Sequence, residues 1–290
     1  MSELRTPQSW ISRFGQSELP VLAQTIAALD AVRQDIDNVS MPRLADAVMH
    51  DPLMTFKVLR YIQQRRSRRQ TGDVTTISHS LMMLGIEPFM AHFADQEPLE
   101  SRLAANPMAL KGARSVISRA RHAALYARDW AVLRHDIEID EVTTAALLHD
   151  FAELLLWCFA PTTAVEMEDT RRLFQKRSEA VQRETLGFPM IALQLELAHA
   201  WQLPDLICQL MDERHALTPR ALNVSLAVAL ARHSAHGWDD AALPDDFAAI
   251  GRLIGLSPDG ARERILKIAA KAAPACEAYG IPPAITGLVV

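Results

Sequence analysis

The sequence predicts an all-α protein, and three observations lead to that prediction. Ala, Leu and Met are abundant while aromatic residues make up only 6% of the chain, and this balance favours helices over strands. Apolar residues recur at helical spacing along most of the chain. No segment shows the sustained apolar–polar alternation of a strand, and Asp259-Gly260 lies between helical stretches. We therefore expect about a dozen helices packed as a multi-helix bundle.

The N-terminal part of the chain is expected to form a loose arm over residues 1–18 and a helical subdomain over residues 19–106. Four leucine and isoleucine residues mark the first apolar helical face: Leu19, Leu22, Ile26 and Leu29. Asp51-Pro52 predicts the start of a central helix, because Asp caps helices and Pro suits the first turn. Residues 63–72 interrupt the pattern and predict an exposed loop, followed by a short helix over residues 77–84 that ends at Gly85.

Residues 107–290 are expected to form a C-terminal helical bundle. A long helix is predicted over residues 107–134, and Asp140 is expected to cap a second one over residues 141–159. Proline marks the beginning of each later helix, at Pro161, Pro189, Pro204, Pro219, Pro244 and Pro258.

Composition argues against several classes of protein. Thirty basic and thirty-five acidic residues give a net charge of -5, whereas nucleic-acid binders usually carry a basic balance. The three cysteines lie far apart, at positions 158, 208 and 276, so neither a disulfide framework nor a zinc knuckle is indicated. No apolar run reaches the ~18 residues that span a bilayer. We expect a cytoplasmic protein without membrane insertion.

His149 and Asp150 form the sharpest chemical signal, because they follow directly on an apolar helix. A neutral imidazole and a carboxylate could share one divalent metal, which could activate water for attack on a phosphate ester. A catalytic metal needs at least three protein ligands and an open position. The pair alone is therefore equally compatible with a structural hydrogen bond.

The surrounding motifs resemble the HD-related output domain (HDOD) family, a branch of the HD phosphohydrolase superfamily. The resemblance runs from about Leu19 to His215. The matching motifs, in chain order, are Asp51-Pro52-Leu53, Val58-Leu59-Arg60, Leu84-Gly85, Leu147-Leu148-His149-Asp150, Glu184 with Gly187, Trp201-Gln202-Leu203-Pro204, and His215. The resemblance implies an HD-like helical bundle with an N-terminal helical subdomain, and a regulatory rather than a hydrolytic role.

Several positions depart from the metal-binding HD pattern. Where those enzymes carry a first histidine, about thirty residues before the pair, this chain has Arg119, and arginine does not ligate metals. His122 lies three residues later and could substitute only in a shifted site. Ala152-Glu153 replaces the Gly-Lys of many HD enzymes, and Met190 stands where the family often has a histidine. Arg119, His122, His149, Asp150 and Met190 thus form a degenerate HD site.

We interpret the chain as a non-catalytic signalling module that binds a protein partner as an adaptor or scaffold, with no cofactor. In this interpretation His149 and Asp150 join helices inside the core. The first alternative is a metal-dependent phosphohydrolase or nucleotide phosphodiesterase that uses His122, His149 and Asp150 as shifted ligands. The second is a sensor of a nucleotide second messenger, in which Arg119 grips a phosphate without turnover.

The basic segment that contains Arg65, Arg66, Arg68 and Arg69 is the strongest candidate for a binding feature. Its guanidinium groups could fork onto phosphates or onto acidic side chains of a partner. The alternative is a solvated loop that only supports solubility. We expect these arginines on one rim of a groove between the subdomains, with the degenerate HD site at its back. Replacing all four with alanine should then weaken partner capture.

Overall fold

Proline and capping side chains set the beginnings of many helices in the computed structural model, which describes residues 5–16, 18–35, 40–65, 74–212, 214 and 217–278. Thr6, Ser40, Thr76, Asn106 and Thr218 each accept a hydrogen bond from the backbone of the helix that follows. Within these residues the only β feature is an isolated bridge between Val21 and Pro98. The all-α prediction is therefore confirmed.

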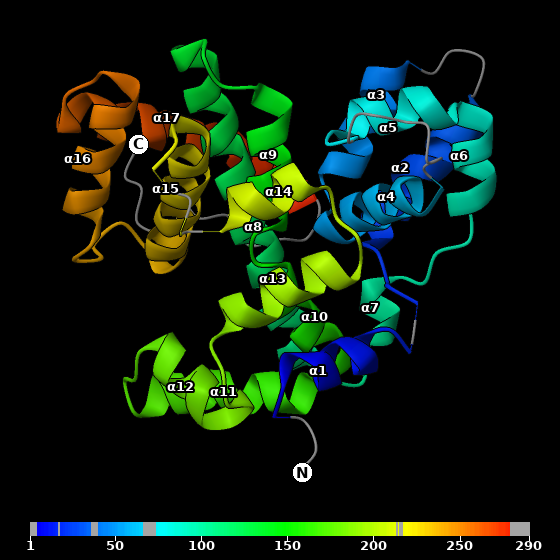
Figure 1. The fold of residues 1–290 in the computed structure, drawn as a ribbon, viewed down its shortest axis with the longest axis horizontal. Coiled ribbons are helices and arrows are strands. Elements are labelled where there is room, and N and C mark those ends of the chain that lie inside the picture. Colours follow the sequence, from blue (N-terminus) through cyan, green and yellow to red (C-terminus); the bar gives the residue numbers. More distant parts are fainter. Residues whose placement is uncertain are drawn as a thin grey trace.

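The first half of the chain forms seven helices in the described residues: α1 (Pro7–Phe14), α2 (Ala23–Gln34), α3 (Met41–Met49), α4 (Pro52–Arg65), α5 (Ile77–Leu84), α6 (Ile86–Phe93) and α7 (Leu99–Arg102). The second half forms α8 (Pro107–Arg134), α9 (Ile139–Leu148), α10 (Phe151–Phe159), α11 (Pro161–Leu173), α12 (Ser178–Leu186), α13 (Met190–Ala200), α14 (Asp205–Met211), α15 (Pro219–His233), the 3-10 helix η3 (Ser234–His236), α16 (Leu243–Ile254) and α17 (Pro258–Ala278). Figure 1 shows α2 to α6 grouped on one side, α8 and α9 in the middle, and α15 and α16 on the other side.

Several helices begin and end where the sequence predicts. The long helix α8 runs over the expected residues 107–134, and α5 ends at Gly85, whose φ of 82° favours glycine. All six prolines that the sequence marks lie at or next to the start of a helix. Pro is compatible with that position because the first helical N–H has no partner within the helix.

The prediction of a loose N-terminal arm over residues 1–18 is wrong for residues 7–14, which form α1. Trp10 and Phe14 are buried, and α1 packs on α13 and α10, away from α2 to α6 (Figure 1). Arg13 fixes one end by donating to the carbonyl oxygen of Phe159 at 3.2 Å. The apolar side chains of this short helix are thus buried against helices more than a hundred residues away.

Two other predicted boundaries need correction. Gln63, Gln64 and Arg65 form the last turn of α4 rather than the start of a loop. The single helix predicted over residues 141–159 is two helices, because the chain leaves helical geometry at Asp150, where φ is -99° and ψ is 24°. The N-cap of the first of these helices is Glu138, and Asp140 lies in its first turn.

The helix pair α9 and α10 forms the centre of the core. By length and composition alone, the stretch Ile139–Phe159 is long and apolar enough to cross a membrane. However, 83% of its most apolar 18-residue segment is buried inside the protein. Phe151, at the start of α10, stacks on Phe56 of α4 with ring centroids 4.0 Å apart. Trp201 packs against Phe56 at 5.2 Å and lies under the guanidinium of Arg60 at 4.6 Å. These contacts join the N-terminal subdomain to the bundle.

Asp51 organises the N-terminal subdomain. Its carboxylate is fully buried and accepts hydrogen bonds from the backbone N–H of Leu22 at 2.7 Å and of Leu53 at 2.8 Å, and from the hydroxyl of Thr25 at 3.0 Å. Burial raises the pKa of Asp51 above its ordinary value, although these hydrogen bonds act in the opposite direction. One carboxylate thereby joins the beginning of α2 to the beginning of α4.

Replacing Asp51 with alanine should destabilise the fold by about 3 kcal/mol, because it leaves several buried donors without an acceptor. Urea unfolding followed by circular dichroism measures this change in the free energy of unfolding. Asp95→Ala, at an exposed position, is the matched control and should change it by less than about 0.5 kcal/mol. Equal unfolding midpoints for the two variants would contradict the role given to Asp51.

Candidate functional site

The break between α9 and α10 creates the candidate site. Gln194 of α13 holds it from both sides: its Oε1 accepts from the N–H of Ala152 at 2.6 Å, and its Nε2 donates to the carbonyl oxygen of Leu148 at 3.1 Å. Gln194 is buried, so these bonds replace helical bonds that the break removes. The chain is thereby fixed where His149 and Asp150 lie.

The carboxylate of Asp150 is the centre of a buried ion network. His149 Nδ1 lies 3.0 Å from Asp150 Oδ1. From α15, Arg232 Nη2 donates to the same oxygen at 2.5 Å, and its Nε donates to Oδ2 at 3.3 Å. From α8, Arg119 Nη2 lies 3.7 Å from Oδ2. Two guanidinium groups therefore surround a carboxylate that HD enzymes use as a metal ligand.

Arg119 also pairs with Glu153, whose Oε2 lies 2.8 Å from Arg119 Nη2. The two departures from the HD pattern at these positions are therefore complementary in charge. An arginine stands at the first-histidine position, and a carboxylate stands where many HD enzymes carry a lysine. Burial lowers the pKa of Arg119, but Glu153 and Asp150 outweigh it and hold that pKa above its ordinary value, so the guanidinium stays charged.

The charge balance of the network keeps Asp150 ionised. Burial by itself raises the pKa of Asp150, but Arg232, His149 and Arg119 together hold it well below the usual range. The carboxylate therefore remains negative at neutral pH, and the network needs no further cation to neutralise it.

His122 does not join Asp150. It lies fully buried on α8, and its Nδ1 is 2.8 Å from the carbonyl oxygen of Ser118 on the preceding turn. Its Nε2 has no hydrogen-bond partner among the residues that the structure describes, and burial lowers the pKa of the imidazole. Within the described part of the chain, no three His, Cys, Asp or Glu side chains converge on a possible metal position. The shifted ligand set of His122, His149 and Asp150 is therefore not assembled.

Met190 is also outside the ion network. Its side chain is largely buried at the start of α13, and its N–H donates to Oε1 of Gln182 at 2.8 Å. The residue of α13 that reaches the site is Gln194, one turn later. Sequence reasoning missed Gln194 and Arg232, because neither belongs to one of the motifs that resemble the HDOD family. Arg232 also lies beyond His215, where the resemblance ends, and His215 itself lies outside the described residues.

Space beside Asp150 is narrow. Alanine and valine side chains from α8, α9 and α15 line it together with the two charged residues, and it does not admit a water-sized sphere. The lining residues are Arg119, Ala120, Ala123, Ala146, Asp150, Val228 and Ala231. A metal with an open coordination position and a phosphate ester would not fit there unless the lining side chains moved.

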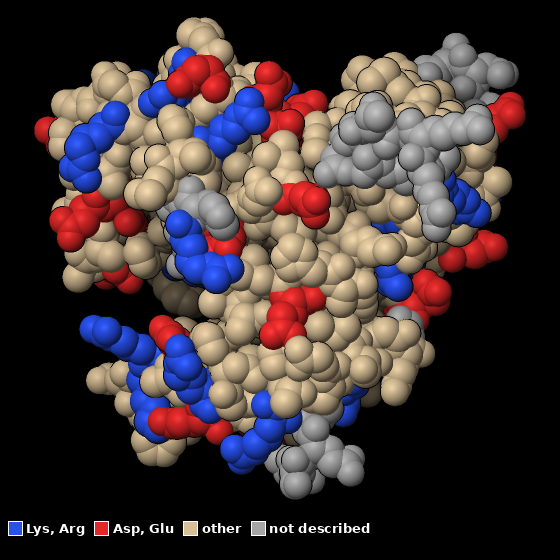
Figure 2. Space-filling view, viewed as in Figure 1, with Lys and Arg blue, Asp and Glu red and all other residues tan. Residues whose placement is uncertain are grey.

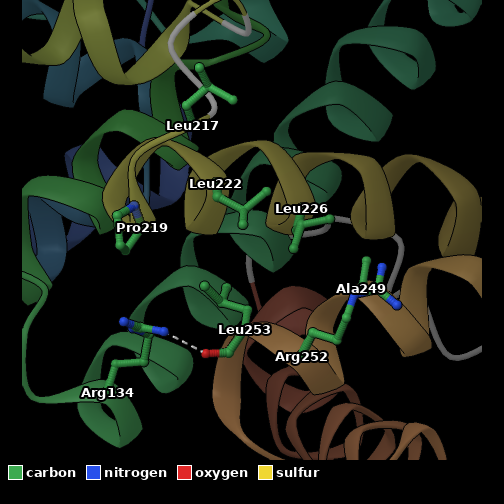
Figure 3. A pocket seen from close by; sticks show the side chains of 8 residues that line it. All are labelled: Arg134, Leu217, Pro219, Leu222, Leu226, Ala249, Arg252 and Leu253. Carbon is green, nitrogen blue, oxygen red and sulfur yellow. Dashed lines mark hydrogen bonds between the residues drawn. The ribbon is translucent and has the colours of Figure 1, made fainter.

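A larger groove lies between α15 and α16, about 270 Å³ in volume (Figure 3). Leucines from both helices line its apolar wall, and Leu217 at its edge is 95% exposed. Two cations line the groove. Arg134 is already paired, because its Nη1 donates to the carbonyl oxygen of Leu253 at 2.8 Å and its Nε and Nη2 donate to the carboxylate of Asp136 at 2.8 and 2.6 Å, whereas Arg252 is exposed. Among the described residues, no acidic side chain lines the groove. The full lining is Arg134, Leu217, Pro219, Leu222, Leu226, Ala249, Arg252 and Leu253. This part of the chain also lies beyond the motifs, so sequence reasoning did not find the groove.

Of the predicted basic segment, Arg65 is described and belongs to a different contact. Its guanidinium lies over the ring of Tyr61 at 3.8 Å, and Tyr61 stacks on His92 with ring centroids 3.8 Å apart. Arg66, Arg68 and Arg69 lie outside the described residues. The groove with these arginines on its rim therefore stays a prediction.

Replacing Asp150 with asparagine should cost about 3 kcal/mol of stability at neutral pH, because Arg119 and Arg232 lose their buried counter-charge. The folded pKa lies below the unfolded value of about 3.9, so this stabilisation is complete above that value and is lost as the pH falls toward the folded pKa. Unfolding free energies of wild type and Asp150→Asn should therefore converge in acid. Asp95→Asn is the exposed control, and a difference that stays constant with pH would contradict the network.

Comparisons with known proteins agree with this architecture. Residues 19–217 match the HDOD domain family. The MmoQ response regulator from Methylococcus capsulatus str. Bath has a TM-score of 0.66 at 21% identity, over 86% of this chain and 98% of that chain. A virulence factor from Campylobacter jejuni subsp. jejuni has a TM-score of 0.63 at 18% identity, over 92% of this chain and 99% of that chain. No curated protein sequence matches the chain. The structural likeness shows a shared fold, and the family match extends over more than half of the sequence, so the chain belongs to the HDOD family.

Proposed function

We propose that this protein is a non-catalytic regulatory module that binds a protein partner in bacterial signalling, in the cytoplasm, without a cofactor. One observation carries the proposal: Arg119 and Arg232 take up the carboxylate of Asp150 that a hydrolytic HD site would offer to a metal. Membership of the HDOD family supports a regulatory role. The similar fold of a protein described as a response regulator is consistent with it.

The charges argue against the phosphohydrolase alternative. A hydrolytic metal needs three protein ligands and an open position, yet both oxygens of Asp150 accept hydrogen bonds from Arg232. A divalent cation next to Arg119 and Arg232 would add to two positive charges already neutralised by Asp150 and Glu153. Binding a metal would therefore require displacing arginines from their partners.

The same pairing weighs against the nucleotide sensor. Arg119 and Arg232 each already bind a carboxylate, so a phosphate would have to compete with Glu153 and Asp150 for them. A protein partner needs neither arginine, because it can bind elsewhere on the surface.

The groove between α15 and α16 is the surface we assign to that partner. Its aliphatic wall suits two neighbouring aliphatic side chains, and the exposed Arg252 complements a carboxylate beside them. We therefore propose a short segment of a protein partner with aliphatic anchors and flanking Asp or Glu residues.

The protein purified without chelators should contain far less than one metal ion per chain by elemental mass spectrometry. It should also leave bis(p-nitrophenyl) phosphate unhydrolysed when manganese is added. Arg119→His restores an imidazole at the first-histidine position and removes one positive charge, so this variant should retain more metal than the wild type. Near-stoichiometric metal in the wild type, together with hydrolysis, would show that the protein is an enzyme.

Peptides selected on the purified protein from a random display library should share aliphatic residues with flanking carboxylates. Leu222→Asp should weaken their binding at least tenfold, about 1.4 kcal/mol, because it puts a charge on the apolar wall and repels the acidic flanks. Arg252→Glu should shift selection toward basic flanks. Leu125→Asp, at a half-exposed position of α8 outside the groove lining, is the control. If the selected peptides bind the wild type and all three variants equally, the groove is not the binding site and the assignment is wrong.

A further inference from the structure

The turn between α11 and α12 exposes two large apolar side chains next to each other. Leu173 and Phe174 are 70% and 68% exposed, although single exposed apolar residues are the usual case on a protein surface. The turn is ordered by backbone hydrogen bonds from Phe174 to Thr170 and from Lys176 to Arg171, both at 3.1 Å. Gln175 adopts a left-handed conformation with φ of 50°. The chain is thus held in a geometry that keeps both side chains in solvent.

This turn belongs to a helix pair with few buried side chains. Within the described residues α12 packs chiefly on α11 and buries only Val181 and Leu186. Figure 1 shows the two helices at one edge of the fold, and Figure 2 shows a hollow between them and α15. Leu173 and Phe174 lie in the turn that joins these two helices and are exposed at this edge of the described fold.

Cations flank the apolar pair on both sides in the sequence. Residues 171–177 read Arg-Arg-Leu-Phe-Gln-Lys-Arg and contain no acidic residue. The carboxylates that pair with Arg171, Arg172 and Lys176 lie farther back on α11 and α12, at Glu168, Asp169 and Glu184. Such exposed pairs are weak, so the cations remain available to another anionic group. Lys176 Nζ lies 5.8 Å from the ring centroid of Phe174, which places charge and apolar surface together.

We propose that the turn formed by residues 171–177 binds the surface of a membrane that contains anionic lipid. Leu173 and Phe174 would enter the boundary between headgroups and acyl chains, while the four cations contact lipid phosphates. An exposed turn that combines apolar side chains with neighbouring cations suits a soft, negatively charged surface. A protein partner would need a deep apolar pocket with an acidic rim to make the same contacts. The contact involves one turn at the interface and no membrane-spanning helix.

Co-sedimentation with vesicles tests the proposal on the whole chain. The protein should bind vesicles of phosphatidylcholine and phosphatidylglycerol in equal parts, and it should not bind vesicles of phosphatidylcholine alone. Added salt should weaken binding, because it screens exposed charges. Leu173→Ser/Phe174→Ser should reduce binding at least about tenfold. Arg172→Gln/Arg177→Gln should reduce it about fivefold for each charge removed.

Met82→Ser/Met83→Ser is the matched control, because it changes another adjacent pair of exposed apolar residues, on α5, and it should bind like the wild type. Circular dichroism checks that all variants keep their helices. Equal binding to neutral vesicles, or full binding by Leu173→Ser/Phe174→Ser, would overturn the proposal. Absence of any vesicle binding would overturn it as well, and crosslinking of residue 174 to an acidic protein would then identify the other class of occupant. The peptide test of the α15–α16 groove uses different residues. The groove proposal and the membrane proposal can therefore each be contradicted without affecting the other.

Discussion

A carboxylate buried between helices must have positive charge beside it, and the Asp150 network is built around that requirement. An uncompensated charge inside the core would cost several kcal/mol. Arg119 from α8, Arg232 from α15 and the neighbouring His149 meet the requirement. Helices α8 and α15 and the end of α9 are thereby joined at one carboxylate. Apolar packing stabilises the contact between these helices. The charge of Asp150 limits the side chains that can lie next to it to those that compensate that charge.

The same requirement explains how an HD-like fold can keep this carboxylate in its core without a metal beside it. In a metal-binding HD site the cation itself would compensate the charge of this carboxylate. In this chain two arginines supply the positive charge, and Glu153 balances the excess. Two of the positions that differ from the HD pattern, Arg119 and Glu153, are therefore paired within the network.

The sequence predicts features that depend on neighbouring residues. The start of α8 at Pro107, the end of α5 at Gly85 and the helix starts marked by proline all follow from local conformational preferences. The break at Asp150 could not be predicted in this way, because the apolar pattern continues through it. Gln194, more than forty residues later, supplies the hydrogen bonds that make the break possible.

Features that rest on distant contacts are the ones the sequence does not reveal. The helical state of residues 7–14 depends on α10 and α13, which bury Trp10 and Phe14. Of the degenerate site, Arg119, His149 and Asp150 meet as their motif positions suggest, whereas His122 and Met190 do not join them. Arg232 lies beyond the family motifs, and only tertiary structure brings it to Asp150.

The stack of Phe151 on Phe56 has a mechanical meaning, because Phe151 follows Asp150 directly in the chain. A shift of the Asp150 backbone would move the first ring of α10, and with it the surface on which α4 rests. Trp201 packs against Phe56 as well, and the guanidinium of Arg60 lies over the ring of Trp201. The Asp150 network thus lies next to the contact between the two halves of the protein, so a movement of this backbone would act directly on that contact.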